Sequence, residues 1–396
     1  MTERLYYHDS FLREFDAQVI ACEPEGDRWK IELDRTAFYP TSGGQPHDTG
    51  KLGDAMVLEV ADAENHRVVH YASAAVALGP VRGQIDWTRR LDHMQQHTGQ
   101  HLLSAAFIEL FQFPTVSFHL GAESSTIDLE ATSLSATQLE EAEKRTNQII
   151  LEDRLVTVRF GTAEELAEAG IRKKVEREGI LRAIEVEGFD RQPCGGTHLA
   201  RTGQAGMLLL RKFERRRESW RVEFVCGFRA LAAARSDYAT LGAVAEQLSC
   251  GLPDVPIVVK KTAEERRAQH AAMKRLEDRL AEHEALALIA ASKSNAPDGT
   301  LTIIAAIDDA SAAYLALVTA KVTAQVKAVV VLASRSTGHV VFGQSKGGTR
   351  DMGSLLRSVL GEFGGKGGGA RDFAQGSLPE TSRIDPFLGR VRAALA

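Results

Sequence analysis

LDHMQQHTGQHLLSAAF, residues 91–107, carries a histidine at every fourth position from His93 to His101. Residues four apart lie one turn apart on the same face of an α-helix, where two imidazoles can bind one ion. The apolar residues that follow continue the helical period. We therefore expect a helix over residues 91–110 that supplies half of a metal site, with Asp92 as its cap and His93 as a polar residue at its start. Two histidines four residues apart also occur by chance, so this spacing alone is weak evidence for a metal site.

The second half of a metal site must come from elsewhere in the chain, and QPCGGTHLA, residues 192–200, offers Cys194 and His198. The two glycines between them let the backbone turn tightly round an ion, and a thiolate beside imidazoles favours zinc. Taken alone, the segment is also compatible with a glycine-rich turn around a buried cysteine. HTGQH lacks the glutamate of His-Glu-x-x-His, so the general base of that metalloprotease class is missing.

Composition excludes several classes of protein. The chain has 396 residues, of which 44% are hydrophobic and 26% charged, as in globular proteins with more than one core. Four cysteines in so long a chain do not form a disulfide framework. The net charge of −5 argues against a surface that binds nucleic acid over its whole extent, but it permits a local basic patch. Without an apolar signal-peptide core or a membrane-spanning run, we expect a cytoplasmic protein with no membrane contact.

The pattern along the chain predicts an α+β fold with four parts. Residues 1–90 alternate short apolar stretches with turns, which is typical of a small β-barrel-like domain. Residues 91–232 mix strands with helices, one of them capped by Ser135. Residues 233–296 predict a helical spacer, either a hairpin, a short coiled coil or a solvated amphipathic helix. Residues 297–396 run strand, helix, strand, which favours an α/β domain.

Four motifs, of which the metal motif is split over two segments, resemble the alanyl-tRNA editing proteins of the AlaX class, which are free-standing and share a zinc-binding editing region with alanyl-tRNA synthetases. HTGQHLLSAAF and CGGTH match its metal motifs, and TAFYPTSGGQPHDTG, residues 36–50, matches its glycine-rich motif. SWRVEFVCGFRAL and GGKGGGARDFAQG resemble the end of the editing domain and the DHHA1 domain. Because the β domain starts within the first residues, we expect the long, DHHA1-bearing editing form and not a synthetase.

The resemblance implies a hydrolase that removes a wrong amino acid, chiefly serine and secondarily glycine, from alanine-specific tRNA. It carries over a zinc site with the ligands His97, His101, Cys194 and His198. It also implies pocket roles for three other positions. His119 could position water, Gln45 could bond the terminal adenosine or the amino acid, and Thr41, with Ser42 second, could detect the hydroxyl of serine. A strand histidine, a turn-capping amide and ordinary turn hydroxyls are the alternative interpretations.

A basic segment, residues 208–221, predicts contact with phosphates of the tRNA acceptor stem. Its cationic residues are Arg211, Lys212, Arg215, Arg216, Arg217 and Arg221. A solvated strand and turn would show the same composition. The glycine-rich tail resembles a DHHA1 surface that contacts RNA or forms a homodimer.

Two alternatives to editing stay open. Four protein ligands complete a tetrahedral zinc site, and complete sites are usually structural. The chain could therefore be a non-catalytic tRNA-binding module with a structural zinc. It could also be a deacylase for another aminoacyl-tRNA.

Overall fold

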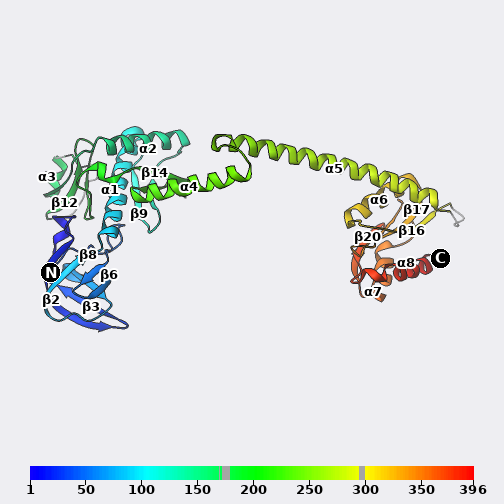
Figure 1. Ribbon diagram of the computed structural model, residues 1–396, viewed down its shortest axis with the longest axis horizontal. Coiled ribbons are helices and arrows are strands. Elements are labelled where there is room, and N and C mark those ends of the chain that lie inside the picture. The colour runs from blue at the N-terminus through cyan, green and yellow to red at the C-terminus, as the bar shows by residue number, and fades with distance from the viewer. Residues whose placement is uncertain (169, 172–178, 294–298) are drawn as a thin grey trace. The chain divides into compact units, whose positions relative to one another are not determined.

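The computed structural model describes residues 1–168, 170–171, 179–293 and 299–396. Helices and several β-sheets alternate along the chain, which confirms the α+β class (Figure 1). The chain forms two compact units, Met1–Val244 and Ala245–Ala396. The expected boundary between residues 296 and 297 lies outside the described residues, and the other domain boundaries stay predictions. Across the described ranges, no helix has the length and apolar character needed to cross a membrane.

The first unit begins with a closed antiparallel barrel. Its strand order is β2-β3-β7-β6-β5-β8. The strands are β2 (Glu14–Glu25), β3 (Arg28–Leu33), β5 (Gly50–Leu52), β6 (Ala55–Ala63), β7 (Arg67–Ala72) and β8 (Gly79–Ile85). β1 (Glu3–Arg4) and β4 (Arg35–Thr36) pair with each other in parallel. Along β2, the buried Phe15, Ala17 and Val19 alternate with exposed residues, so every second side chain enters the barrel core.

Helix α1 (Trp87–Phe111) follows β8 directly and leads from the barrel into the rest of the first unit (Figure 1). The Asp86 carboxylate accepts a hydrogen bond from the Arg89 backbone N at 3.2 Å and caps the helix. The predicted cap at Asp92 is therefore wrong, because the helix begins about one and a half turns earlier, where the Asp86 side chain caps it. Asp92 pairs with Arg229 instead, and His93 is buried within the helix and does not lie at its start.

Among its described residues, the first unit also has two further sheets and three further helices, the last of which ends just beyond Val244. One sheet has the order β14-β15-β10-β9, and the other has the order β11-β12-β13. Their strands are β9 (Thr115–Leu120), β10 (Ser125–Leu129), β11 (Val156–Gly161), β12 (Leu181–Val186), β13 (Asp190–Pro193), β14 (Leu208–Arg215) and β15 (Trp220–Cys226). The helices are α2 (Ala136–Leu151), α3 (Ala163–Glu168) and α4 (Phe228–Gln247). Ser135 and Gln138 form a capping box at α2, as the sequence predicts for Ser135.

Helix α1 is held in the core of this region by apolar and polar contacts. Its buried Met94, Leu102 and Phe107 belong to one core cluster with residues of both sheets. The Gln96 side chain also pairs with the backbone of Cys226 in β15, through two hydrogen bonds of 2.9 Å each. The position of α1 is therefore fixed both by packing and by directional bonds.

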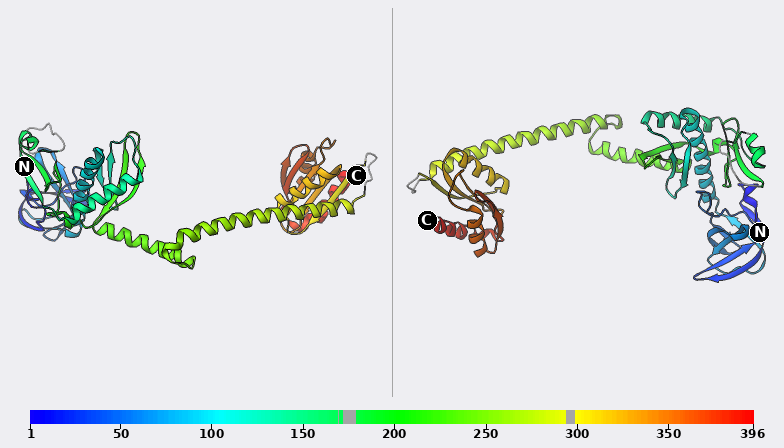
Figure 2. Two further views of the ribbon diagram at one scale, coloured as in Figure 1. Left: turned by 90° about the horizontal axis from the view of Figure 1, so that it is seen from above. Right: turned by 180° about the vertical axis from the view of Figure 1, so that it is seen from behind.

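The second unit is a five-stranded sheet covered by helices. The strand order is β16-β17-β18-β20-β19, and only β16 and β17 run parallel. The strands are β16 (Leu301–Ile307), β17 (Ala328–Ser334), β18 (His339–Gln344), β19 (Lys366–Gly369) and β20 (Phe373–Ser377). The helices are α5 (Val255–Ala291), which is continuous in both views of Figure 2, α6 (Ala312–Gln325), α7 (Met352–Glu362) and α8 (Ile384–Leu395). Val330 and Leu332 of β17 face α5 and α6, whereas Val329 and Val331 face α7 and α8.

Candidate metal centre

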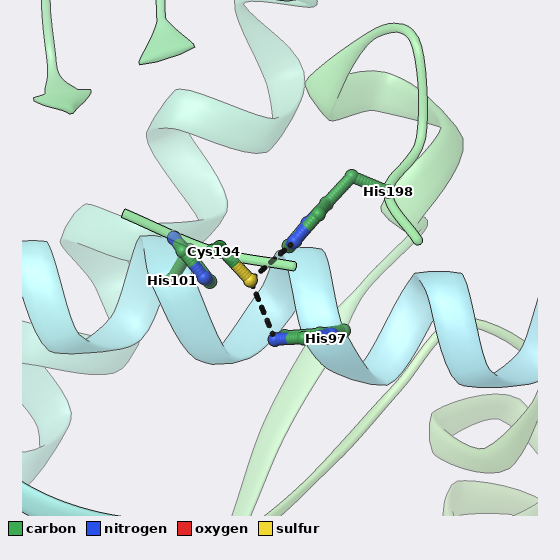
Figure 3. Close-up of side chains that lie close together, drawn as sticks. All are labelled: His97, His101, Cys194 and His198. Carbon is green, nitrogen blue, oxygen red and sulfur yellow. Dashed lines mark hydrogen bonds between the residues drawn. The ribbon is translucent and has the colours of Figure 1, made fainter. Parts of the chain in front are cut away.

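Four side chains from two distant segments meet in the first unit. His97 and His101 project from α1, and Cys194 and His198 lie in the turn that follows β13 (Figure 3). Their ligand atoms all lie within 4.8 Å of one another. Cys194 Sγ lies 3.4 Å from His97 Nε2 and 3.2 Å from His198 Nε2. A tetrahedral zinc ion separates sulfur and nitrogen ligands by roughly 3.5 Å, so the cluster fits an ion of that size.

Each histidine of the cluster turns its other ring nitrogen toward a polar partner. His97 Nδ1 lies 2.7 Å from Gln45 Oε1, and His198 Nδ1 lies 3.3 Å from Thr98 Oγ1. His101 Nδ1 lies 3.5 Å from a carboxylate oxygen of Asp190. Metal-binding histidines are typically oriented in this way by an outer partner. The arrangement is therefore typical of a metal centre.

Hydrogen bonds from Arg182 and close packing against His97 fix the turn that carries Cys194 and His198. Arg182 of β12 donates to the backbone oxygens of Cys194 at 2.6 Å and of Gly196 at 2.9 Å. A Cβ atom at Gly196 would lie 2.2 Å from His97 Cε1, so only glycine lets the turn approach the ring this closely. The CGGTH sequence thus permits a contact that a larger residue would block.

Burial and charge act in opposite directions on the cluster. Burial alone raises the pKa of the Cys194 thiol, but the charges of His97 and His198 lower it well below its ordinary value. Burial alone lowers the pKa of His101, but the neighbouring Asp190 carboxylate and Cys194 thiolate raise it to about 9. Burial, together with the charge of His97, holds the pKa of His198 well below its usual range. The thiolate is the form of cysteine that binds metals, and a metal would displace the proton of His101.

The glycine-rich loop is anchored to α1 by a buried ion pair. Arg90 Nε donates to both carboxylate oxygens of Asp48 at 3.0 Å, and both side chains are fully buried. Asp48 also accepts from the Tyr39 backbone N at 2.6 Å, and Arg90 donates to the Ser10 backbone O at 2.9 Å. This pair places the loop against the start of the helix that carries His97.

The structure brings Gln45 to the cluster but gives Thr41 and Ser42 other contacts. Gln45 is fully buried, bonded to His97 and to Thr197. The Thr41 hydroxyl is exposed and lies 3.0 Å from His47 Nδ1, and Ser42 forms a backbone bridge with Gln45. None of the contacts described for Thr41 reaches the four ligands.

His119 lies on β9 and is exposed. Its neighbour Phe118 packs on His97, with 5.5 Å between ring centroids. Because successive side chains of a strand point to opposite faces, Phe118 occupies the side that meets the cluster. The role of His119 in the pocket stays a prediction.

The basic segment lies on β14, β15 and the turn between them, and much of its charge is paired. Arg211 binds Asp237, Arg221 binds Asp128, and Lys212 and Arg216 bind Glu214. Arg215 and Arg217 border an open cavity of about 780 Å³ together with Glu130 and Glu218. These two arginines are therefore the better candidates for contact with phosphate.

Sequence analysis missed the residues that support the cluster. They are Asp48, Arg90, Thr98, Arg182, Asp190 and Thr197. The only sequence signal was proximity, since Asp190 and Thr197 lie in or just before the CGGTH motif and Thr98 lies between the two helical histidines. Asp48 lies in the glycine-rich motif, three residues after Gln45, whereas Arg182 and Arg90 carry no such signal.

Comparison with known proteins identifies related chains. Residues 181–223 match the threonyl and alanyl tRNA synthetase second additional domain, and residues 299–396 match the DHHA1 domain. The alanyl-tRNA editing protein AlaX-L of Pyrococcus horikoshii is 30% identical, with 100% of each chain covered. The alanyl-tRNA editing protein Aarsd1 of Mus musculus is 30% identical over 65% of this chain and 66% of its own. An alanine–tRNA ligase of Pyrococcus abyssi is 29% identical over 98% of this chain but only 43% of the ligase.

Proposed function

The chain belongs to the family of alanyl-tRNA editing proteins, and we propose that it hydrolyses the ester linking a wrong amino acid to alanine tRNA. Serine is the expected main target and glycine the second. The observation that carries the proposal is the Cys/His₃ cluster joined through Gln45 to the glycine-rich loop. The segments that carry the four proposed ligands and the glycine-rich loop all belong to the first unit, which supports the proposal.

Zinc is the metal that we propose for the cluster, because one thiolate and three imidazoles form a typical zinc set. When bound, zinc would supply Lewis-acid polarisation of the ester carbonyl or orient a water molecule. His97, His101, Cys194 and His198 would hold it. The buried Gln45, Thr98 and Asp190 would keep the imidazoles oriented.

Discrimination between seryl-tRNA and alanyl-tRNA must come from groups other than the metal. Seryl- and alanyl-tRNA share the ester and the RNA, so only a polar group that bonds the serine hydroxyl can separate them. Thr41 stays our candidate, and it would have to share its hydroxyl with His47. His119 remains the candidate for positioning water. For tRNA contact we propose the basic segment, chiefly Arg215 and Arg217, and for homodimer formation the DHHA1-like domain.

One observation favours a second candidate function, a tRNA-binding module with a structural metal. The cluster offers four protein ligands, and its three histidines are almost completely buried. Such complete, enclosed sets are usually structural. Hydrolytic activity separates the two candidates.

The experiment compares hydrolysis of seryl-, glycyl- and alanyl-tRNA made on alanine tRNA, together with zinc content by elemental analysis. The wild type should carry about one zinc per chain and hydrolyse the seryl and glycyl esters while sparing alanyl-tRNA. The double variant His101→Ala, Cys194→Ala should lose both metal and activity. The matched control is Cys250→Ala, His270→Ala, which removes the same residue types away from the cluster and should change neither. Zinc retained with all three esters intact would favour the structural module.

A further inference from the structure

The Gln45 side chain is buried, whereas a side chain that binds substrate must be accessible from the pocket. Gln45 lies in the glycine-rich loop, yet its side chain has no exposed surface. Its Oε1 lies 2.7 Å from His97 Nδ1 and 3.2 Å from the Thr197 backbone N, and its Nε2 lies 2.9 Å from Thr197 Oγ1. An amide bonded at both ends and closed off from solvent is not available to an adenosine or an amino acid.

The backbone N–H of Thr197 settles which end of the amide faces His97. A backbone N–H can only donate, so the atom that it contacts must be the oxygen of Gln45. An amide oxygen cannot donate, so the proton of the His97 contact sits on Nδ1. In the neutral ring, which is the form that binds a metal, Nε2 then carries no proton and faces Cys194 Sγ, 3.4 Å away.

We propose that Gln45 is a positioning residue that fixes the tautomer and ring orientation of His97, and so makes metal binding depend on the glycine-rich loop. The inference rests on the proposed metal site. Gly196 supports it, because a Cβ atom there would lie 2.8 Å from Gln45 Oε1 and would push the amide away from the ring. The Asp48–Arg90 pair anchors the same loop to α1, so Gln45 reaches His97 from a fixed base.

The test replaces Gln45 by methionine, which keeps the length of the side chain and removes the amide. Zinc affinity is measured on the metal-free protein by competition with a chromophoric chelator. The visible spectrum of the cobalt(II)-loaded protein reports the geometry of the ligands. Because outer partners of ligating histidines contribute about 10- to 100-fold to metal affinity, Gln45→Met should bind zinc 10- to 100-fold more weakly and change the cobalt spectrum.

A second variant separates the oxygen from the rest of the amide. Gln45→Glu keeps an oxygen that can accept from His97 Nδ1 and from the Thr197 backbone N, so it should restore wild-type zinc affinity and the wild-type cobalt spectrum. If Gln45 only packed against its neighbours, the Met and Glu variants would bind zinc with equal affinity, or the charged Glu variant would bind it more weakly.

The matched control is Gln100→Met on α1. Gln100 is as well buried and precedes His101, but its Nε2 bonds Ser104 Oγ at 2.8 Å and its described contacts include none of the four ligands. This variant should bind zinc like the wild type. Equal losses in Gln45→Met and Gln100→Met would show a general packing effect and overturn the inference.

The remaining outcomes distinguish this inference from the proposed function. If wild type binds one zinc and Gln45→Met binds it equally well with an unchanged cobalt spectrum, the positioning role is refuted and the site stands. If wild type binds no zinc, the proposed site fails and the inference fails with it. Circular dichroism of each metal-free variant establishes that it is folded before its affinity is compared.

Discussion

The buried Asp48–Arg90 pair gives the most direct test of how the loop is held. We consider Asp48→Asn, which keeps the shape of the side chain and removes its charge. The change leaves the Arg90 guanidinium fully buried without its counterion, and its acceptors are then the new amide oxygen and the Ser10 and Ala37 backbone oxygens. Breaking a buried ion pair by neutralising one partner costs about 3–5 kcal/mol, because a charge is left without its counterion.

This cost corresponds to a large shift in thermal stability. For a unit of the size of Met1–Val244, each kcal/mol lowers Tm by about 2–4 °C, so Asp48→Asn should lower Tm by about 6–20 °C. The matched control is Glu109→Gln, which breaks the half-exposed pair with Arg145 and should cost about 1 kcal/mol or less. The double variant Asp48→Asn, Arg90→Met should recover part of the loss, since it removes the unpaired charge.

Tryptophan fluorescence follows the unfolding of the correct unit. The chain has three tryptophans, Trp29, Trp87 and Trp220, and all lie within Met1–Val244. Unfolding of the second unit therefore does not contribute to the signal. A loss for Asp48→Asn no greater than that for Glu109→Gln would refute the reasoning, because burial would then add nothing to the value of the pair.

Three further predictions concern recognition, stability and modularity. Thr41→Val should slow hydrolysis of seryl-tRNA by about 5- to 150-fold, the value of one hydrogen bond, and change glycyl-tRNA hydrolysis little; equal effects on both esters would exclude Thr41 as the detector. Burial lowers the pKa of His70 to about 4, so the folded state favours the neutral ring. Stability of the first unit should therefore be lost as pH falls from about 6.5 toward 4, and His70→Gln should flatten that slope in fluorescence-monitored unfolding. A chain ending at Val244 should keep zinc and hydrolysis but lose tRNA affinity or dimerisation; unchanged affinity and unchanged mass in gel filtration would assign the second unit another task.

Local patterns predicted the features that depend on local geometry. The spacing of His97 and His101 places both on one helical face whatever surrounds the helix, and the structure brings them to Cys194 and His198. The Ser135 cap was predictable for the same reason. The start of α1 was not, because Asp86 and Asp92 are both possible caps by residue type, and the structure has Asp86 as the cap.

Apart from the pairing of the two metal motifs, contacts between distant segments were not predictable. Gln45 is far from His97 in sequence, and nothing in the motif indicates that its amide turns inward. For His119, the alternation of a strand is evident in the sequence, but which face meets α1 depends on how the sheet packs. Side chains that face α1 alternate along β9 with side chains that face away from it. Phe118 faces α1 and contacts the ring of His97, and His119 does not.

Helix α1 imposes a constraint on how the gene can change length. Helix α1 contacts three other segments of the first unit from fixed angles around its axis. Arg90 and His97 contact the glycine-rich loop, Gln96 contacts β15, and His101 contacts Asp190 of β13. Inserting or deleting one codon between 90 and 101 would rotate every later side chain by about 100° and break all the downstream contacts together. The exposed turn between β2 and β3, residues 26–27, holds none of these side chains and no residue proposed to contact tRNA. Descendants of this gene should therefore accumulate length differences in that turn, while the codon count between Arg90 and His101 stays constant.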